Sequence, residues 1–168
     1  MSYIISPPEE TALQAHLHKL RTQLHEDPEL SWQEHRTTRL VRRELEALCL
    51  EPVPLGLPTG TAALLRGALP GPTVGLRADL DALPITERTG AEFSSRVPGV
   101  MHACGHDIHM AALLGAARLL AARREQLAGN VLFLFQPAEE AATGAMLVLE
   151  QGLFRRVPMA GMLALHVW

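Results

Sequence analysis

The run Val131-Leu132-Phe133-Leu134-Phe135 constrains the fold more than any other feature of the sequence. It contains no polar residue, it follows the turn-forming pair Gly129-Asn130, and it is too short for a typical helix. Such a run predicts a strand that is buried on both faces, as in parallel sheets covered by helices.

The flanking segments extend this pattern. Strands are predicted at Thr73–Arg77 and Met162–Val167, and helices at Asp107–Gln126 and from Pro137 to Gly152. The alternation of strand and helix after residue 73 predicts an α/β fold with a mainly parallel sheet flanked by helices. An earlier strand, Ala62–Leu65, is joined to the strand at Thr73 by a Gly/Pro turn short enough for a hairpin.

The N-terminal third is predicted to be helical. A first helix is expected at Glu10–Leu24. Ser31 and Glu34 have the spacing of a capping box, which predicts a second helix running to about Leu48. The long segment Asp79–Gly105 has no clear periodicity, and loops of this length are often functional.

Composition excludes several classes of function. The net charge of -3 gives no basic field for nucleic acid or acidic membranes, and no apolar run approaches the roughly 20 residues of a membrane span. Residues 1–10 do not resemble a signal peptide. Two cysteines, Cys49 and Cys104, do not make a disulfide framework. We therefore expect a cytoplasmic protein, and the length of 168 residues fits one domain.

Metal-binding residue types collect where the predicted strands end. Parallel strands joined by crossover helices bring their carboxyl ends to one rim of the sheet, where ligands bind. The residues that follow these strands, or lie at the start of the intervening helix, are Asp79, Asp81, Glu139, Glu140, His166, Cys104, His106 and His109. The sequence therefore predicts a ligand site at this rim.

Each residue also has a simpler interpretation. Adjacent glutamates in a first helical turn usually interact with the helix dipole, and a single His such as His166 is often an ordinary core or surface residue. The segment Met101–His109 is harder to explain in this way, since it holds three His, one Cys and one Asp. Thiolate and imidazole suit zinc and its neighbours. A closed structural zinc site is a weaker alternative, because it does not require Glu139 beside Glu140.

These residues fall in motifs that are similar to those of a known enzyme family. The motifs are His25–Leu30, Gly75–Pro84, Met101–His109, Phe135–Glu140 with Gly144-Ala145, and Leu165–Val167. On these motifs the chain resembles metal-dependent amidohydrolases of the zinc-exopeptidase-like fold, which include hippurate hydrolase, plant indole-acetyl-amino-acid hydrolases, aminoacylases and carboxypeptidases.

The resemblance implies a role for each residue. Cys104, His106, Glu140 and His166 fall on the family's metal-ligand positions, Glu139 on its general acid/base, and Asp79 and Asp81 on supporting positions. It also implies two divalent metal ions, with zinc, manganese, cobalt and nickel all open. The implied reaction is hydrolysis of the amide bond of an N-acyl amino acid or small peptide.

The resemblance also implies that part of the family architecture lies outside this sequence. After the segment that matches Leu165–Val167, family members continue into a lid and dimerisation domain, then complete the catalytic domain with one more metal-ligand His. We therefore expect residues 1–168 to be a truncated N-terminal portion of the catalytic domain. An inactive metal-binding fragment with fewer metals, a half-domain completed by a second polypeptide, and a homo-oligomer all stay open.

Overall fold

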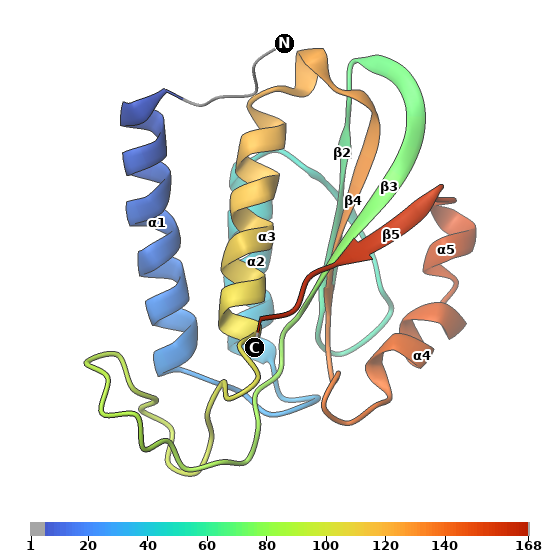
Figure 1. Cartoon of the computed structure of the whole chain (residues 1–168). Helices are drawn as coiled ribbons and strands as arrows, with labels where there is room; N and C mark the ends of the chain where they lie inside the picture. Colours follow the sequence, from blue (N-terminus) through green and yellow to red (C-terminus); the bar gives the residue numbers. More distant parts are fainter. Residues whose placement is uncertain (1–5, 168) are drawn as a thin grey trace.

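A mixed five-stranded sheet forms the centre of the molecule, in the order β1-β2-β4-β3-β5 (Figure 1). The computed structural model describes residues 6–167. The strands are β1 (Glu51–Val53), β2 (Thr61–Arg66), β3 (Leu69–Asp79), β4 (Ala128–Gln136) and β5 (Gly161–Ala164). Strand β3 pairs in parallel with β4 and β5, whereas β2 pairs antiparallel with β4 and β1. The predicted parallel sheet is confirmed for the strands after residue 69.

The strand predicted at Val131–Phe135 is confirmed as the core of β4, which lies between β2 and β3. Phe133 and Phe135 face the larger hydrophobic cluster, which also contains residues of the long helices. Leu132 and Leu134 face a second cluster on the other side. Successive side chains of a strand point to opposite faces. An apolar residue at every position therefore allows both faces of β4 to be buried.

Helices cover both faces of the sheet (Figure 1). The helices α1 (Pro7–Glu26), α2 (His35–Ala47) and α3 (His106–Ala121) lie on one face, and α4 (Gly144–Glu150) and α5 (Leu153–Arg156) on the other. A short 3₁₀ helix, η1, spans Arg124–Gln126. Among residues 6–167, no helix is both long and apolar enough to cross a membrane. The prediction that residues 1–10 are not a signal peptide concerns in part residues 1–5, which lie outside the described residues.

Two local predictions are wrong. Strands β2 and β3 do not form a hairpin, because β4 inserts between them and pairs with both; the strand with two apolar faces takes the most covered position. Ser31 and Glu34 do not form a capping box. The Ser31 hydroxyl donates to Asp81, and the Glu34 carboxylate accepts from Thr59 and Ala138. A capping box occurs instead at α1, where Glu9 accepts hydrogen bonds from the Ser6 backbone N–H and hydroxyl.

The helix predicted from Pro137 begins only at Gly144. Residues 137–143 form a tight turn in which Ala138 and Ala142 have left-handed backbone angles, with φ of 50° and 55°. The turn closes so tightly that a Cβ on Gly144 would lie 1.7 Å from the carbonyl oxygen of Pro137. The Glu139–Glu140 pair is therefore on a turn and not in the first turn of a helix.

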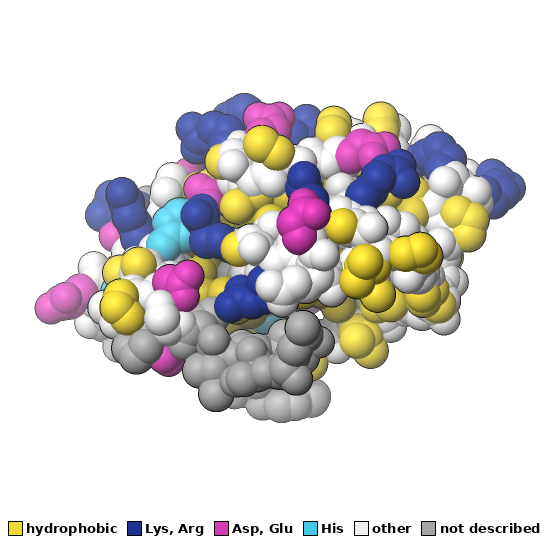
Figure 2. All heavy atoms as spheres, turned by 90° about the horizontal axis from the view of Figure 1, so that it is seen from above, with side chains coloured by type: hydrophobic (Ala, Val, Ile, Leu, Met, Phe, Trp, Pro, Cys, Tyr) yellow, Lys and Arg dark blue, Asp and Glu magenta, His cyan; other side chains and the backbone are white. Residues whose placement is uncertain are grey.

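Seen from above (Figure 2), basic and acidic side chains are interspersed over the surface. Hydrophobic side chains gather on the side where β5 and α5 lie. The exposed apolar residues at and after β5 include Leu163 and Leu165, which are 64% and 85% exposed.

Candidate metal centre

The predicted residues converge at the carboxyl ends of the parallel strands. Cys104, His106 and Glu140 each offer one ligand atom, and these three atoms lie within 4.8 Å of one another. They come from the loop before α3, the first residue of α3, and the turn after β4. Three segments that are distant in sequence thus present a thiol, an imidazole and a carboxylate to one point.

His106 is buried, and its orientation is fixed from behind. Its Nδ1 lies 2.8 Å from the backbone carbonyl oxygen of Asp81, which can only accept, so Nδ1 carries the proton. Nε2 lies 3.9 Å from Glu139 Oε2 and 4.0 Å from Glu140 Oε1. Burial disfavours the imidazolium, but hydrogen bonding to Asp81 and the charge of Asp79 more than offset this and raise the pKa of His106.

Asp81 supports both His106 and the turn that carries the glutamates. It is 1% exposed, and its Oδ2 accepts hydrogen bonds from Ser31 Oγ at 2.7 Å and from the Glu140 backbone N–H at 2.9 Å. Burial raises the pKa of Asp81, but its hydrogen bonds outweigh this, so the pKa is lowered overall. The carboxylate holds its neighbours in place, consistent with the supporting position that the sequence predicts.

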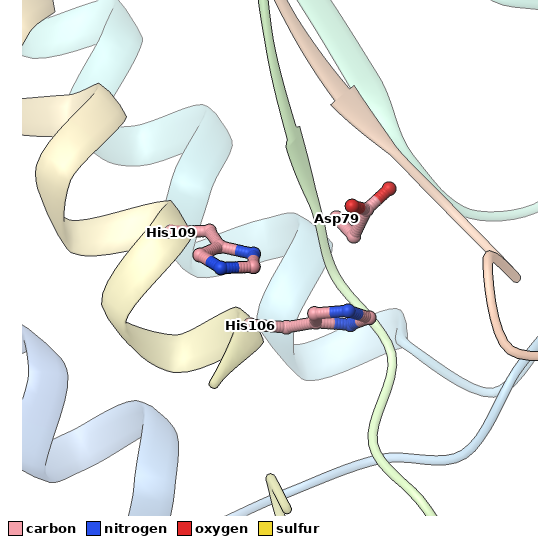
Figure 3. Close-up of side chains that lie close together, drawn as sticks. All are labelled: Asp79, His106 and His109. Atoms are coloured by element: carbon pink, nitrogen blue, oxygen red, sulfur yellow. The ribbon is translucent and has the colours of Figure 1, made fainter. Parts of the chain in front are cut away.

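Asp79 ends β3 and is engaged by Arg77, whose guanidinium donates to its carboxylate. Burial raises the pKa of Asp79 to about 6, against the opposing effect of Arg77. Asp79, His106 and His109 also bring ligand atoms within 4.8 Å of one another (Figure 3). Since Arg77 already neutralises Asp79, this second group is less suited to a cation than the first.

His109 is among the residues predicted at this rim, but the family resemblance implies no role for it. Its Nε2 accepts a hydrogen bond from the Val167 backbone N–H at 3.1 Å, and its ring centroid lies 4.9 Å from that of His166. Burial and the charges of His106 and His166 lower the pKa of His109 to about 4. Its spacing of three residues from His106 places both on one helix face, so His109 lies beside the predicted ligands.

Cys104 and His166 lie on the solvent side of the site. Cys104 Sγ is 4.0 Å from His166 Nε2, and His166 is exposed. Burial, together with Glu140, raises the pKa of the Cys104 thiol to about 11. Both neighbouring glutamates approach His106, but the side chain of Glu139 is 40% exposed and that of Glu140 is 20% exposed.

The donors fit a divalent cation. Glu140 Oε1 and Asp81 Oδ1 are buried and have no hydrogen-bond partner within residues 6–167. Buried acceptors without partners are costly, and a cation beside Glu140 would satisfy that oxygen. A set of sulfur, nitrogen and carboxylate oxygen matches the preferences of zinc and related transition metals.

The chain is similar to known proteins over most of its length. The model of the family described as peptidase family M20/M25/M40 matches residues 75–168. An N-acetylcysteine deacetylase of Bacillus subtilis is 50% identical over 147 residues, covering 87% of this chain and 39% of that protein. A thermostable carboxypeptidase of Saccharolobus solfataricus is 47% identical over 142 residues, covering 83% of this chain and 36% of that protein.

A solved structure shows the same fold. A Bacillus subtilis protein, described as a dinuclear metal binding peptidase from the M20 family, superposes with a TM-score of 0.90 at 46% sequence identity. The match covers 94% of this chain and 44% of that one. The chain thus spans about two fifths of the length of the proteins that it matches.

Proposed function

The chain belongs to peptidase family M20/M25/M40, and from this we propose that it forms part of a metal-dependent hydrolase of amide bonds in N-acyl amino acids or small peptides. The observation that carries the proposal is the convergence of Cys104, His106 and Glu140 within 4.8 Å, with Glu139 beside them. The related N-acetylcysteine deacetylase and carboxypeptidase support the substrate class, since both names describe cleavage of an amide bond to an amino acid.

We assign four residues as metal ligands: Cys104, His106, Glu140 and His166. Two ions are supported by the dinuclear relative, and zinc, manganese, cobalt and nickel all suit this donor set. When bound, such ions polarise a carbonyl and lower the pKa of a water molecule. His106 is prepared for ligation because its protonated Nδ1 faces Asp81, which leaves Nε2 toward the site.

Glu139 is proposed as the general acid/base. Its carboxylate is the more exposed of the pair, and it lies 3.9 Å from His106 Nε2. It would take a proton from the attacking water and deliver it to the leaving amine. Glu140 is the less exposed of the two, and its backbone N–H donates to Asp81. One glutamate thus handles protons while its neighbour stays fixed.

Two alternatives are supported by one observation. His166 is exposed, whereas His106 is buried, so one edge of the site is open to solvent. The residues could then bind a metal without turnover, or a second polypeptide could complete the site.

We also propose that residues 1–168 are the N-terminal portion of the catalytic domain and that the protein is cytoplasmic, where Cys104 would stay reduced.

The test is hydrolysis of N-acetyl and N-benzoyl amino acids by the purified chain, with metal content measured on the same sample. We expect Glu139→Gln to retain the metal and to lower kcat by roughly 10²- to 10⁴-fold. The control is Glu150→Gln, an exposed glutamate at the end of α4, which should behave as wild type. Metal binding without hydrolysis in the wild type would support the non-catalytic alternative, and absence of bound metal would refute the proposal.

A further inference from the structure

The segment that connects α1 to α2 contacts the turn that carries Glu139 and Glu140. Ser31 Oγ and the Glu140 backbone N–H share one oxygen of Asp81. The indole Nε1 of Trp32 donates to Thr143 Oγ1 at 3.2 Å. These contacts connect residues more than a hundred positions apart in sequence, and they reach the middle and the C-terminal end of the turn at residues 137–143.

Glu34 makes the deepest of these contacts. Its side chain is fully buried, at 0% exposure. Oε1 accepts the backbone N–H of Ala138 at 2.8 Å, and Oε2 accepts the hydroxyl of Thr59 at 2.7 Å. A buried carboxylate is costly unless its oxygens are hydrogen-bonded, and here both are used. One of them reaches the residue directly before Glu139.

Ala138 has an unusual backbone conformation that requires such support. Its φ of 50° lies in the left-handed region, which is unfavourable for residues with a Cβ. Strained residues persist only where the surroundings fix them, and they concentrate at functional sites. A second contact lies behind the turn, since a Cβ on Gly60 would be 2.6 Å from Pro137 Cδ. The loop of Thr59 and Gly60 therefore packs directly on the turn.

Capping of α2 does not account for the Glu34 side chain. Its carboxylate accepts hydrogen bonds from Thr59 and Ala138, neither of which belongs to α2. The first-turn N–H of Thr37 is accepted by Glu29 at 2.8 Å, and that of Thr38 by the Glu34 backbone carbonyl at 2.9 Å. Glu29 thus performs the capping task, and the carboxylate of Glu34 serves the turn.

We propose that Glu34 is a positioning residue of the metal centre: by holding Ala138 in its left-handed conformation, it fixes the turn from which Glu140 reaches Cys104 and His106 and Glu139 reaches His106. This inference rests on the proposed function for the roles of the two glutamates. Its geometric part, that Glu34 fixes the turn, stands apart from metal binding and is tested apart from it.

Glu29 provides a matched control. It lies in the same connecting segment, is 6% exposed, and accepts hydrogen bonds from the backbone N–H and hydroxyl of Thr37. Its side-chain bonds run to α2 and not to the turn. A general structural effect of losing a buried carboxylate would therefore appear in both Glu29→Leu and Glu34→Leu, whereas a positioning effect appears only in the second.

The first measurement is amide hydrogen exchange in the full 168-residue chain without metal. We expect the Glu140 amide, which bonds to Asp81 and not to Glu34, to exchange at least about tenfold faster in Glu34→Leu. Glu34→Gln should remain near wild type, because its amide oxygen can still accept from Ala138. Glu29→Leu should leave this amide unchanged. Equal exchange at Glu140 in Glu34→Leu and wild type would overturn the proposal.

The second measurement is titration with Cd²⁺, monitored through the ultraviolet absorption of a cadmium–thiolate bond. We expect Glu34→Leu to weaken binding roughly 10- to 100-fold, with the band from Cys104 restored at saturation, and Glu29→Leu to bind as wild type. If the wild type binds no Cd²⁺, the proposed function fails, and hydrogen exchange alone decides the role of Glu34. If Glu34→Leu does not fold, Glu34→Asp carries the same expectations in both measurements, because its shorter side chain cannot reach both partners.

Discussion

His106 donates a 2.8 Å hydrogen bond from Nδ1 to the backbone carbonyl of Asp81. The bond fixes the tautomer of the ring and turns Nε2 toward the glutamates. Because the acceptor is a main-chain atom, it persists when the Asp81 side chain is changed. The contribution of the Asp81 carboxylate can therefore be measured separately from the orientation of His106.

Asp81→Asn is predicted to weaken metal binding roughly 10- to 100-fold. The substitution removes the negative charge 3.5 Å from His106 Nδ1, and an amide oxygen is a weaker acceptor than a carboxylate oxygen for Ser31 Oγ and the Glu140 N–H. Competition titration against a chromogenic chelator measures the affinity. Ser31→Ala, which removes one of the two bonds, should show a smaller loss. Equal affinities for wild type and Asp81→Asn would contradict the assigned supporting role.

Metal binding is predicted to release a proton from Cys104. The pKa of this thiol is raised to about 11 by burial and Glu140, so it is protonated near pH 7, whereas a metal binds the thiolate. Affinity should therefore rise about tenfold for each pH unit between 7 and 9. Calorimetry in two buffers of different ionisation enthalpy counts the protons. Cys104→Ala should release about one proton fewer, and the same proton count in both proteins would exclude Cys104 as a ligand.

The metal-free chain is predicted to lose stability as the pH falls from about 6.5 to 4 because of His102. Burial lowers the pKa of His102 to about 4, and the ring nitrogens have no hydrogen-bond partner within the described residues. Between these pH values the unfolded chain binds the proton and the folded chain does not, so stability rises with pH across this window. His102 alone should account for about 3 kcal/mol of the unfolding free energy.

Urea unfolding of wild type and His102→Leu at several pH values, with chelator present, measures this contribution. The leucine variant cannot take up a proton at this position, so its stability should fall less steeply below pH 6.5. Above that pH the difference between the two proteins should be constant. Parallel curves over the whole range would show that His102 titrates normally in the folded chain.

Strand β5 is predicted to promote self-association of the 168-residue chain. It is the outermost strand beside β3, and Leu163 and Leu165 are 64% and 85% exposed. Open strand edges and exposed apolar surface both favour association. The double substitution Leu163→Lys with Leu165→Lys should shift sedimentation toward monomer, whereas Met146→Lys, on an exposed position of α4, should not. If the sedimentation distribution of the double variant equals that of wild type, β5 is not the surface through which the chain associates.

The sequence was most informative where local pattern and burial agree. The apolar run in β4 identified the central strand, because a segment without polar residues has few alternatives to complete burial. The positions of Cys104 and His106 at the start of a crossover helix, and of Glu140 after a strand, predicted that the three lie at one rim. Parallel strands share their carboxyl ends at this rim. Their roles as metal ligands stay a proposal that the substitutions above test.

The sequence was least informative where a distant contact decides the local structure. Alanine and glutamate favour helix, so the segment after Pro137 was predicted to be helical. The bond from Ala138 to Glu34 and the packing of Gly60 against Pro137 instead hold it as a turn. The same contact explains the failed capping box, because Glu34 has the correct spacing for a cap but a partner more than a hundred residues away. Neither effect can be read from neighbouring residues alone.

The position of β4 in the sheet has a consequence for biosynthesis. This central strand is made at residues 128–136, after both of its neighbours, β2 and β3. During translation those two strands leave the ribosome without the partner that joins them, and their apolar faces are exposed while α3 is being made. Intermediates of this kind are prone to aggregate and to engage chaperones. The turn with Glu139 and Glu140 follows β4 directly, so the nascent chain acquires its central strand and the proposed general acid/base almost simultaneously.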